Sequence, residues 1–202
     1  KVYQHITRIE DLDLEALPKS FVAKGRHDSG SVVLVIDKNT EDWELLRRRC
    51  ETTLYSVYGL SKREYWYKDI PKGIIIEEYL RDDNYFVPLD FKLLVFHGKV
   101  QFIQVFHDRH LRTSLRIYDR SWNPLSVGRP GVPLAPVIKR PKQLEHMVEV
   151  AETLAEGFDF VRVDLYAPND ERVVFGEFTF APSSGRRPFV PREFDWELGS
   201  YW

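Results

Sequence analysis

The order of strand-like and helix-like segments is the feature of this chain that most restricts its fold. Two short runs rich in β-branched and aromatic residues come first, a helical pattern follows, and five more such runs surround a second helical pattern. The runs predict strands at residues 20–24, 31–37, 73–80, 91–96, 99–106, 158–166 and 172–180. Apolar residues at helical spacing predict helices over 46–57 and 144–155. This order is typical of an α+β protein with mainly antiparallel sheets, and not of a parallel βαβ series.

The turns and loops support hairpins between consecutive strands. His97-Gly98 and the segment 167–170 have turn composition and separate neighbouring strands. The stretch 121–141 contains five prolines and is predicted to be an ordered loop. Neither G-x-G-x-x-G nor G-x-x-x-x-G-K-[ST] occurs, so the commonest nucleotide-binding signatures are absent from the sequence.

The composition excludes several broad classes of protein. With 43% hydrophobic residues among 202, the chain can bury the core of one domain or of one domain with two lobes. A net charge of -2 argues against a polycation that binds nucleic acid or a membrane surface, and the single Cys50 permits neither an internal disulfide nor a cysteine-built zinc site. The longest apolar runs, such as 32–36, are far shorter than the roughly 20 residues of a membrane span. We therefore expect a cytoplasmic protein.

Two segments in the first third of the chain could contact a nucleotide. Lys24 ends a strand and is followed by the glycine-containing turn 25–31, so an ammonium group and backbone N–H groups could meet one phosphate. The alternative is a solvated lysine beside an ordinary hairpin turn. Glu77 and Glu78 follow the β-branched run 74–76, where a strand end could bind a base edge and carboxylates could lie near a ribose; the alternative is a strand that meets solvent.

The most informative polar residues lie on the last two predicted strands. Arg162 and Asp164 are two residues apart and share one strand face, as Glu177 and Thr179 do on the next strand. If the hairpin pairs these faces, two carboxylates and a hydroxyl converge beside an arginine. Oxygen ligands of this kind suit Mg²⁺ that bridges nucleotide phosphates. The alternative is an exposed sheet face with cross-strand ion pairs.

The stretch 101–140 is basic and could bind an anionic substrate. Its Lys and Arg residues exceed its Asp residues by five charges. The alternative is a solvated face. The basic residues of this stretch are Arg109, Arg112, Arg116, Arg120, Arg129, Lys139 and Arg140.

Taken in order, these pieces resemble the ATP-grasp superfamily and, within it, the TupA-like group of amide ligases associated with teichuronopeptide and other surface polymers. The matching segments are 17–24 with 27–30, 75–80, 90–92 through 98–99, 102–105 with 108–109, 118–123, 156–164, 176–180 and 195–199. The resemblance implies an α+β ATP-grasp fold in which two lobes, 1–78 and 79–202, grip ATP between them. Family members also carry an upstream domain, which we expect to be missing here because the chain begins at Lys1 and its only methionine is Met147.

The resemblance also implies roles for individual residues. Lys24 would hold the ATP phosphates under a closing turn, 77–80 would be the adenine hinge, and Asp90 a ribose contact. The implied nucleotide-binding residues are Lys24, His27, Ser29, Gly30, Glu77, Glu78, Tyr79, Leu80 and Asp90. The implied phosphoryl-transfer residues are Lys92, Arg109 and Arg162, and the implied Mg²⁺ ligands are Asp164, Glu177 and Thr179. Thr179 stands where the superfamily usually has asparagine and Ser183 replaces a glycine, which favours one metal ion over two.

The activity that the resemblance implies is an ATP-dependent carboxylate-amine ligase. It would join an amino acid or another amine to an acidic glycan, such as a uronic-acid-containing surface polysaccharide or its precursor, through an acyl phosphate. The alternatives are an ATP-dependent phosphotransferase on the same scaffold, and a non-catalytic module that binds ATP or glycan. An upstream domain or a partner protein could complete the site.

Overall fold

The computed structural model describes residues 1–60, 63–107 and 113–202. Within them the chain forms two compact units, Lys1–Tyr79 and Leu80–Trp202, where the sequence suggested 1–78 and 79–202. Each unit has its own sheet and its own core. None of the helices in the described part of the chain has the length and the apolarity that crossing a membrane requires.

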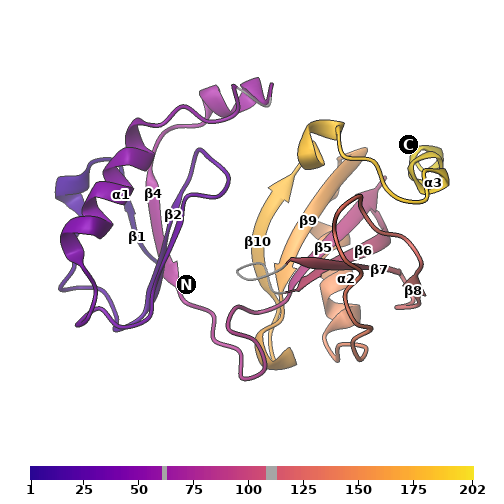
Figure 1. The fold of residues 1–202 in the computed structure, drawn as a ribbon, viewed down its shortest axis with the longest axis horizontal. Helices are drawn as coiled ribbons and strands as arrows, with labels where there is room; N and C mark the ends of the chain where they lie inside the picture. The colour runs from indigo at the N-terminus through magenta and orange to yellow at the C-terminus, as the bar shows by residue number, and fades with distance from the viewer. Residues whose placement is uncertain (61–62, 108–112) are drawn as a thin grey trace. The chain divides into compact units, whose positions relative to one another are not determined.

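The first unit is a four-stranded antiparallel sheet with one helix packed on it (Figure 1). The strand order is β1-β4-β2-β3. The strands are β1 (Val2–Ile6), β2 (Phe21–Gly25), β3 (Val32–Val35) and β4 (Ile74–Glu78), the helix is α1 (Trp43–Tyr55), and short 3-10 turns are η1 (Ile9–Asp11) and η2 (Tyr65–Asp69).

Helix α1 forms because its start is capped and its apolar residues fall on one side. The Asp42 carboxylate accepts a hydrogen bond from the Leu45 N–H at 2.9 Å, which satisfies one of the free donors of the first turn. Leu46, Cys50 and Leu54 recur at every fourth position and are buried against the sheet. Burial raises the pKa of the Cys50 thiol, so this cysteine is a core residue and not a nucleophile.

The second unit is a six-stranded antiparallel sheet with the order β10-β9-β5-β6-β7-β8 (Figure 1). Its strands are β5 (Asp90–Phe96), β6 (Lys99–His107), β7 (Ser114–Asp119), β8 (Pro124–Leu125), β9 (Phe160–Tyr166) and β10 (Val174–Thr179). Its helices are α2 (Leu144–Leu154) and α3 (Glu193–Ser200), with 3-10 turns η3 (Pro168–Asp170) and η4 (Pro182–Gly185).

Both faces of this sheet are covered, and the two covers differ. On one face Phe91, Leu93 and Val95 of β5 pack in a core shared with α2. On the other, Leu94 and Phe96 pack in a second core that includes residues of α3. Because side chains alternate between the two faces along β5, Asp90 and Lys92 lie on the same face as the second core. They lie near the start of the strand, however, where no residue of β5 belongs to that core.

The structure confirms the predicted antiparallel α+β architecture and most of its elements. His97 and Gly98 both have positive φ, 46° and 72°, as a two-residue hairpin turn of the expected kind requires. Strands β1, β7 and β8 and helix α3 were not predicted. Helix α3 escaped the sequence analysis because it buries only Phe194 and leaves Trp196 75% exposed, so it has little helical periodicity to detect.

Candidate functional site

A row of polar side chains crosses four neighbouring strands of the second sheet. In the strand register Glu177 pairs with Asp164, Asp164 with Lys92, and Lys92 with Gln104. Cross-strand partners in an antiparallel sheet point to the same face, so the four side chains lie in line on the face opposite α2. The row runs through strands β10, β9, β5 and β6.

Lys92 lies at the centre of this row and is almost completely buried. It is 5% exposed; its ammonium group donates to Asp164 Oδ2 and forms an ion pair with Asp90 Oδ2 at 2.9 Å. The two aspartates are each 1% exposed. A buried ammonium group requires such partners, because burial without them would favour the neutral amine.

Arg162 binds both carboxylate oxygens of the same aspartate. Its Nε donates to Asp164 Oδ1 at 2.6 Å and its Nη2 to Asp164 Oδ2 at 2.7 Å, a two-point contact that fixes the guanidinium plane. Nη2 also donates to Thr179 Oγ1 at 2.8 Å. Burial works against the charge of Arg162, but the Asp164 carboxylate outweighs it and raises the pKa of Arg162 above its ordinary value.

Glu177 differs from the buried members of the row because 59% of its side chain is exposed. Its Oε1 lies 3.7 Å from Arg162 Nη2. Burial of its carboxyl group and the negative charge of Asp164 raise the pKa of Glu177, although solvent at this half-open position moderates the shift. Glu177 is thus a carboxylate whose negative charge is not fully compensated.

The donor set fits Mg²⁺ that is shared with a ligand. Asp90, Asp164 and Glu177 are three carboxylates beside two cations, Lys92 and Arg162, so the cluster has an excess of negative charge. Within the described ranges no three His, Cys, Asp or Glu side chains gather as a closed metal cluster. Mg²⁺ commonly binds through one or two carboxylates plus substrate phosphates, and the pair of Asp164 and the open Glu177 matches that pattern.

In the first unit, two residues predicted to contact a nucleotide form an ion pair. Lys24 Nζ on β2 lies 2.7 Å from Glu77 Oε1 on the neighbouring β4. Both side chains are about 30% exposed, so the pair borders solvent and the ammonium group keeps room for a further ligand. Glu77 and Glu78 end β4, while Tyr79 and Leu80 follow it on either side of the boundary between the units.

The turn after Lys24 is anchored by His27. The ring is 2% exposed, its Nε2 lies 3.0 Å from the Thr53 carbonyl oxygen, and its Nδ1 accepts from the Gly73 N–H at 3.4 Å. The His27 side chain therefore fastens the turn to its own unit. A phosphate contact of His27 stays a prediction, and Ser29 and Gly30 are the exposed part of the same turn.

Asp90 is also buried, and its Oδ2 forms an ion pair with Lys92 Nζ at 2.9 Å; its contact with a ribose stays a prediction. Its role in the structure is to hold Lys92 in the polar row.

The basic residues that were predicted to bind an anionic substrate are mostly engaged elsewhere. Arg116 Nε donates to the Ala135 carbonyl oxygen at 2.8 Å, and Arg120 pairs with Glu152. These two arginines fasten a loop and a helix to the sheet. Arg109, which was predicted to face the phosphates, and Arg112 lie outside the described residues.

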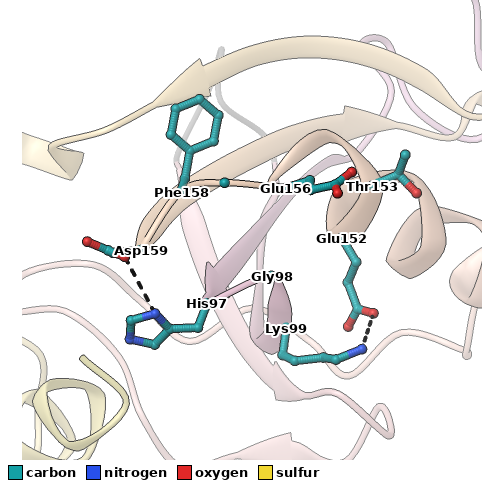
Figure 2. A pocket seen from close by; sticks show the side chains of 9 residues that line it. His97, Gly98, Lys99, Glu152, Thr153, Glu156, Phe158 and Asp159 are labelled. Carbon is teal, nitrogen blue, oxygen red and sulfur yellow. Dashed lines mark hydrogen bonds and ion pairs between the residues drawn. The ribbon is translucent and has the colours of Figure 1, made fainter.

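A shallow pocket of about 520 Å³ lies at the turn between β5 and β6 (Figure 2). Four of its polar side chains form two pairs: Figure 2 shows His97 directed at Asp159 and Lys99 at Glu152, and these pairs are 3.7 Å and 3.2 Å apart. The pocket lies at the other end of β5 from Asp90, so it is separate from the polar row. We do not assign it to the candidate site.

Gln104 is the member of the row that the residue-by-residue reasoning missed. It is 1% exposed, and its Oε1 is buried without a hydrogen-bond partner among the described residues. A polar residue inside the apolar run 102–105 was the available signal. A buried amide beside Lys92 adds polarity to the centre of the site.

Comparison with known proteins gives a consistent family and fold. A family model described as TupA-like ATPgrasp matches residues 4–202. The solved structures that resemble the chain include D-alanine–D-alanine ligase from Bacillus anthracis in complex with ATP, at a TM-score of 0.50 and 19% identity over 87% of this chain and 47% of that one. A second structure of that ligase gives a TM-score of 0.51 and 17% identity, and the match covers 98% of this chain and 58% of the ligase chain. Comparison with curated proteins gave no match.

At these identities the structural likeness shows the fold, which is that of the ATP-grasp ligases. The chain spans about half the length of the ligases it resembles.

Proposed function

Because the chain belongs to the TupA-like ATP-grasp family, we propose that it is an ATP-dependent ligase that joins a carboxylate to an amine. The observation that best supports this proposal is the polar row of the second unit, in which Asp164 is held by Lys92 and Arg162 and faces the more open Glu177. The row contains cations and metal-type oxygen donors. Phosphoryl transfer needs such groups for charge neutralisation and positioning, and it needs no protein nucleophile.

The proposed reaction has two steps. A substrate carboxylate attacks the γ-phosphate of ATP, giving an acyl phosphate and ADP. An amine then attacks the acyl carbon and displaces phosphate, which leaves an amide. In the first step Arg162 and Lys92 would neutralise charge on the transferred phosphoryl group, each kept in place by Asp164.

We propose that Asp164 and Glu177 hold the Mg²⁺ of Mg·ATP, with Thr179 beside them. The bound ion would neutralise negative charge on the phosphates. In the structure Thr179 Oγ1 accepts a hydrogen bond from Arg162 Nη2, so its first role would be to orient that arginine. In the first unit Lys24 and the backbone of the turn at Ser29 and Gly30 would contact phosphates, and 77–80 would contact the adenine.

The proposed acceptor is an acidic glycan, such as one that contains uronic acids, and the proposed amine is an amino acid. The support is the family, together with the excess of arginine side chains near the polar row, which suits an anionic acceptor. We propose that the reaction takes place in the cytoplasm, where ATP is supplied.

The test is an ADP-release assay on the purified chain with Mg·ATP, uronic acids and amino acids, run with and without hydroxylamine. A ligase gives ADP, free phosphate and, with hydroxylamine, a hydroxamate, because hydroxylamine traps the acyl phosphate. A phosphotransferase on the same scaffold gives ADP and a stable phosphorylated product without hydroxamate. A non-catalytic module binds ATP without turnover, and either of these results would overturn the proposal.

A further inference from the structure

Arg129 lies in a loop of the second unit that is fastened to the segment between η4 and α3. The Gly128 N–H donates to the Val190 carbonyl at 2.9 Å, and the Val190 N–H donates back to the Gly128 carbonyl at 3.0 Å. A second bridge joins Arg129 to Val132 across the following turn. These backbone contacts fix the position from which the Arg129 side chain extends.

The Arg129 side chain is held against an aromatic ring. Its guanidinium carbon lies 4.5 Å from the centre of the Phe189 ring, which is itself 6% exposed and belongs to the core under α3. Nη1 donates to the Arg187 carbonyl oxygen at 3.4 Å. Stacking restrains the guanidinium plane, and no hydrogen bond of the Nη2 group to a described residue is observed.

The charge of Arg129 has no carboxylate partner. Among the described residues it forms no ion pair, and its Nε is buried without a hydrogen-bond partner. Arg120, Arg140 and Arg162 of the same unit all pair with carboxylates. Arg129 therefore carries a partly buried charge that no carboxylate among the described residues compensates, although a buried charge is normally paired.

The surrounding charges make this position attractive to an anion. Burial, and then the positive charges of Arg162 and Arg187, lower the pKa of Arg129 to about 10, and Asp195 offsets them only in part. Both Asp195 oxygens already accept from the Phe189 N–H at 3.2 Å. Arg129 thus lies in a positive field from two neighbouring arginines, and a bound anion would offset that field.

We propose that Arg129, with Arg187 beside it, binds a second anionic group of the acceptor, in addition to the carboxylate that reacts near Arg162. The substrate class is then a polyanion, such as an oligouronide, and not a simple monocarboxylic acid. This inference rests on the proposed function. The planar fork of Arg129 suits a carboxylate with two parallel hydrogen bonds, and a phosphate group has the same charge complementarity.

The test measures binding without ATP, so that it does not depend on ligase activity. The probes are galacturonate, digalacturonate and inorganic phosphate, titrated calorimetrically into the wild-type chain, Arg129→Gln, Arg129→Lys and the control Arg140→Gln, an exposed arginine paired with Glu145. We expect digalacturonate affinity to fall about tenfold or more in Arg129→Gln, as for a lost charged hydrogen bond, and not in Arg140→Gln. Galacturonate affinity should change much less.

The remaining variants separate the two sources of the anionic group. If the group is a carboxylate, Arg129→Lys should lose digalacturonate affinity because lysine lacks the fork, and phosphate should compete weakly. If it is a phosphate, Arg129→Lys should keep phosphate affinity and phosphate should displace digalacturonate. Either pattern supports an anion site at Arg129.

Unchanged digalacturonate and phosphate affinities in Arg129→Gln would overturn the inference, and so would the absence of binding of both probes to the wild-type chain. A melting temperature of Arg129→Gln far below that of the wild type, with unchanged anion affinity, would show a structural arginine and would also overturn it. Failure of the hydroxamate assay together with Arg129-dependent anion binding would reject the proposed reaction and leave the anion site standing.

Discussion

Lys92 and Asp164 are cross-strand partners on β5 and β9, and the Lys92 ammonium group donates to Asp164 Oδ2 although the two residues are 72 positions apart in the chain. Asp90 Oδ2 forms an ion pair with the same ammonium group at 2.9 Å, and Arg162 donates to both carboxylate oxygens of Asp164. A buried cation therefore joins two buried carboxylates, and we expect its removal to lower both the stability of the fold and the activity.

The variant Lys92→Met should lower the free energy of unfolding by about 3 kcal/mol, because removing one partner of a buried ion pair leaves the other charge without compensation. The double variant Lys92→Met/Asp90→Asn should regain part of that loss, since it also removes a stranded carboxylate. Urea unfolding at neutral pH measures both. A Lys92→Met protein as stable as the wild type would show that the ion pairs of Lys92 with Asp90 and Asp164 make no net contribution to stability.

Substitutions of Asp164 and Glu177 should have different effects on the stability of the fold but the same effect on the magnesium dependence of ATP binding. We expect Asp164→Asn to destabilise the fold, because Lys92 and Arg162 lose their shared carboxylate, and Glu177→Gln to leave stability nearly unchanged, because that side chain is 59% exposed. Both variants should lose most of the magnesium dependence of ATP binding. The measurement is calorimetric titration of ATP with and without Mg²⁺. If both variants keep the magnesium dependence of the wild type, the assignment of Asp164 and Glu177 as Mg²⁺ ligands is wrong.

Lys24→Met should weaken ATP binding about tenfold or more while the melting temperature of the ligand-free protein falls only slightly. The pair with Glu77 borders solvent, and such pairs contribute roughly 1 kcal/mol or less. Lys19→Met is the matched control, because Lys19 also pairs with a carboxylate, Asp37, at 3.0 Å in the same unit. Equal ATP affinity in the two variants would make Lys24 an ordinary surface residue.

Glu152 on α2 should make stability depend on pH. Burial tends to raise its pKa, but hydrogen bonds from Arg120, the Val100 N–H and Lys99 outweigh burial and hold the pKa of Glu152 below its ordinary value of 4.5. The unfolded state therefore binds a proton first as the pH falls. The stabilisation is complete above about pH 4.5 and is lost as the pH falls through the lower pKa of the folded state.

Glu152→Gln should accordingly lower the free energy of unfolding by about 2 kcal/mol near pH 7, and the difference from wild type should shrink as the pH falls below about 4.5. Denaturant unfolding over this pH range measures the difference. Glu145→Gln on the same helix is the control, because Glu145 is exposed and its pair with Arg140 lies at the surface. A difference that stays constant down to about pH 3 would contradict the assignment.

Local patterns were sufficient for the parts of the site that lie on one hairpin. The alternation along β9 and β10 placed Arg162 with Asp164 and Glu177 with Thr179, and the register pairs those faces as the sequence predicted. The period of two is a property of any extended backbone, so it can be read without knowledge of the rest of the fold. The functional roles of these residues remain predictions.

Burial and long-range partners could not be read in the same way. His27 and Asp90 have polar side chains in segments that suit ligand contacts, yet packing buries both and gives them partners within their own units. Arg129 was one of several basic residues in a proline-rich stretch, and nothing local distinguished it from Arg116. Its distinction comes from Phe189, which lies 60 positions later in the chain and is brought beside it by the bridge between Gly128 and Val190.

The sequence by itself determined the α+β class, most of the strands and the side-chain faces within each hairpin, because these depend on residue spacing and turn chemistry. Only the tertiary structure decided that β5 lies between β9 and β6, and hence that Lys92 lies between Asp164 and Gln104. Strand order depends on which apolar faces can be buried together across long loops, and that choice is made by the packing of the whole unit and not by any local pattern.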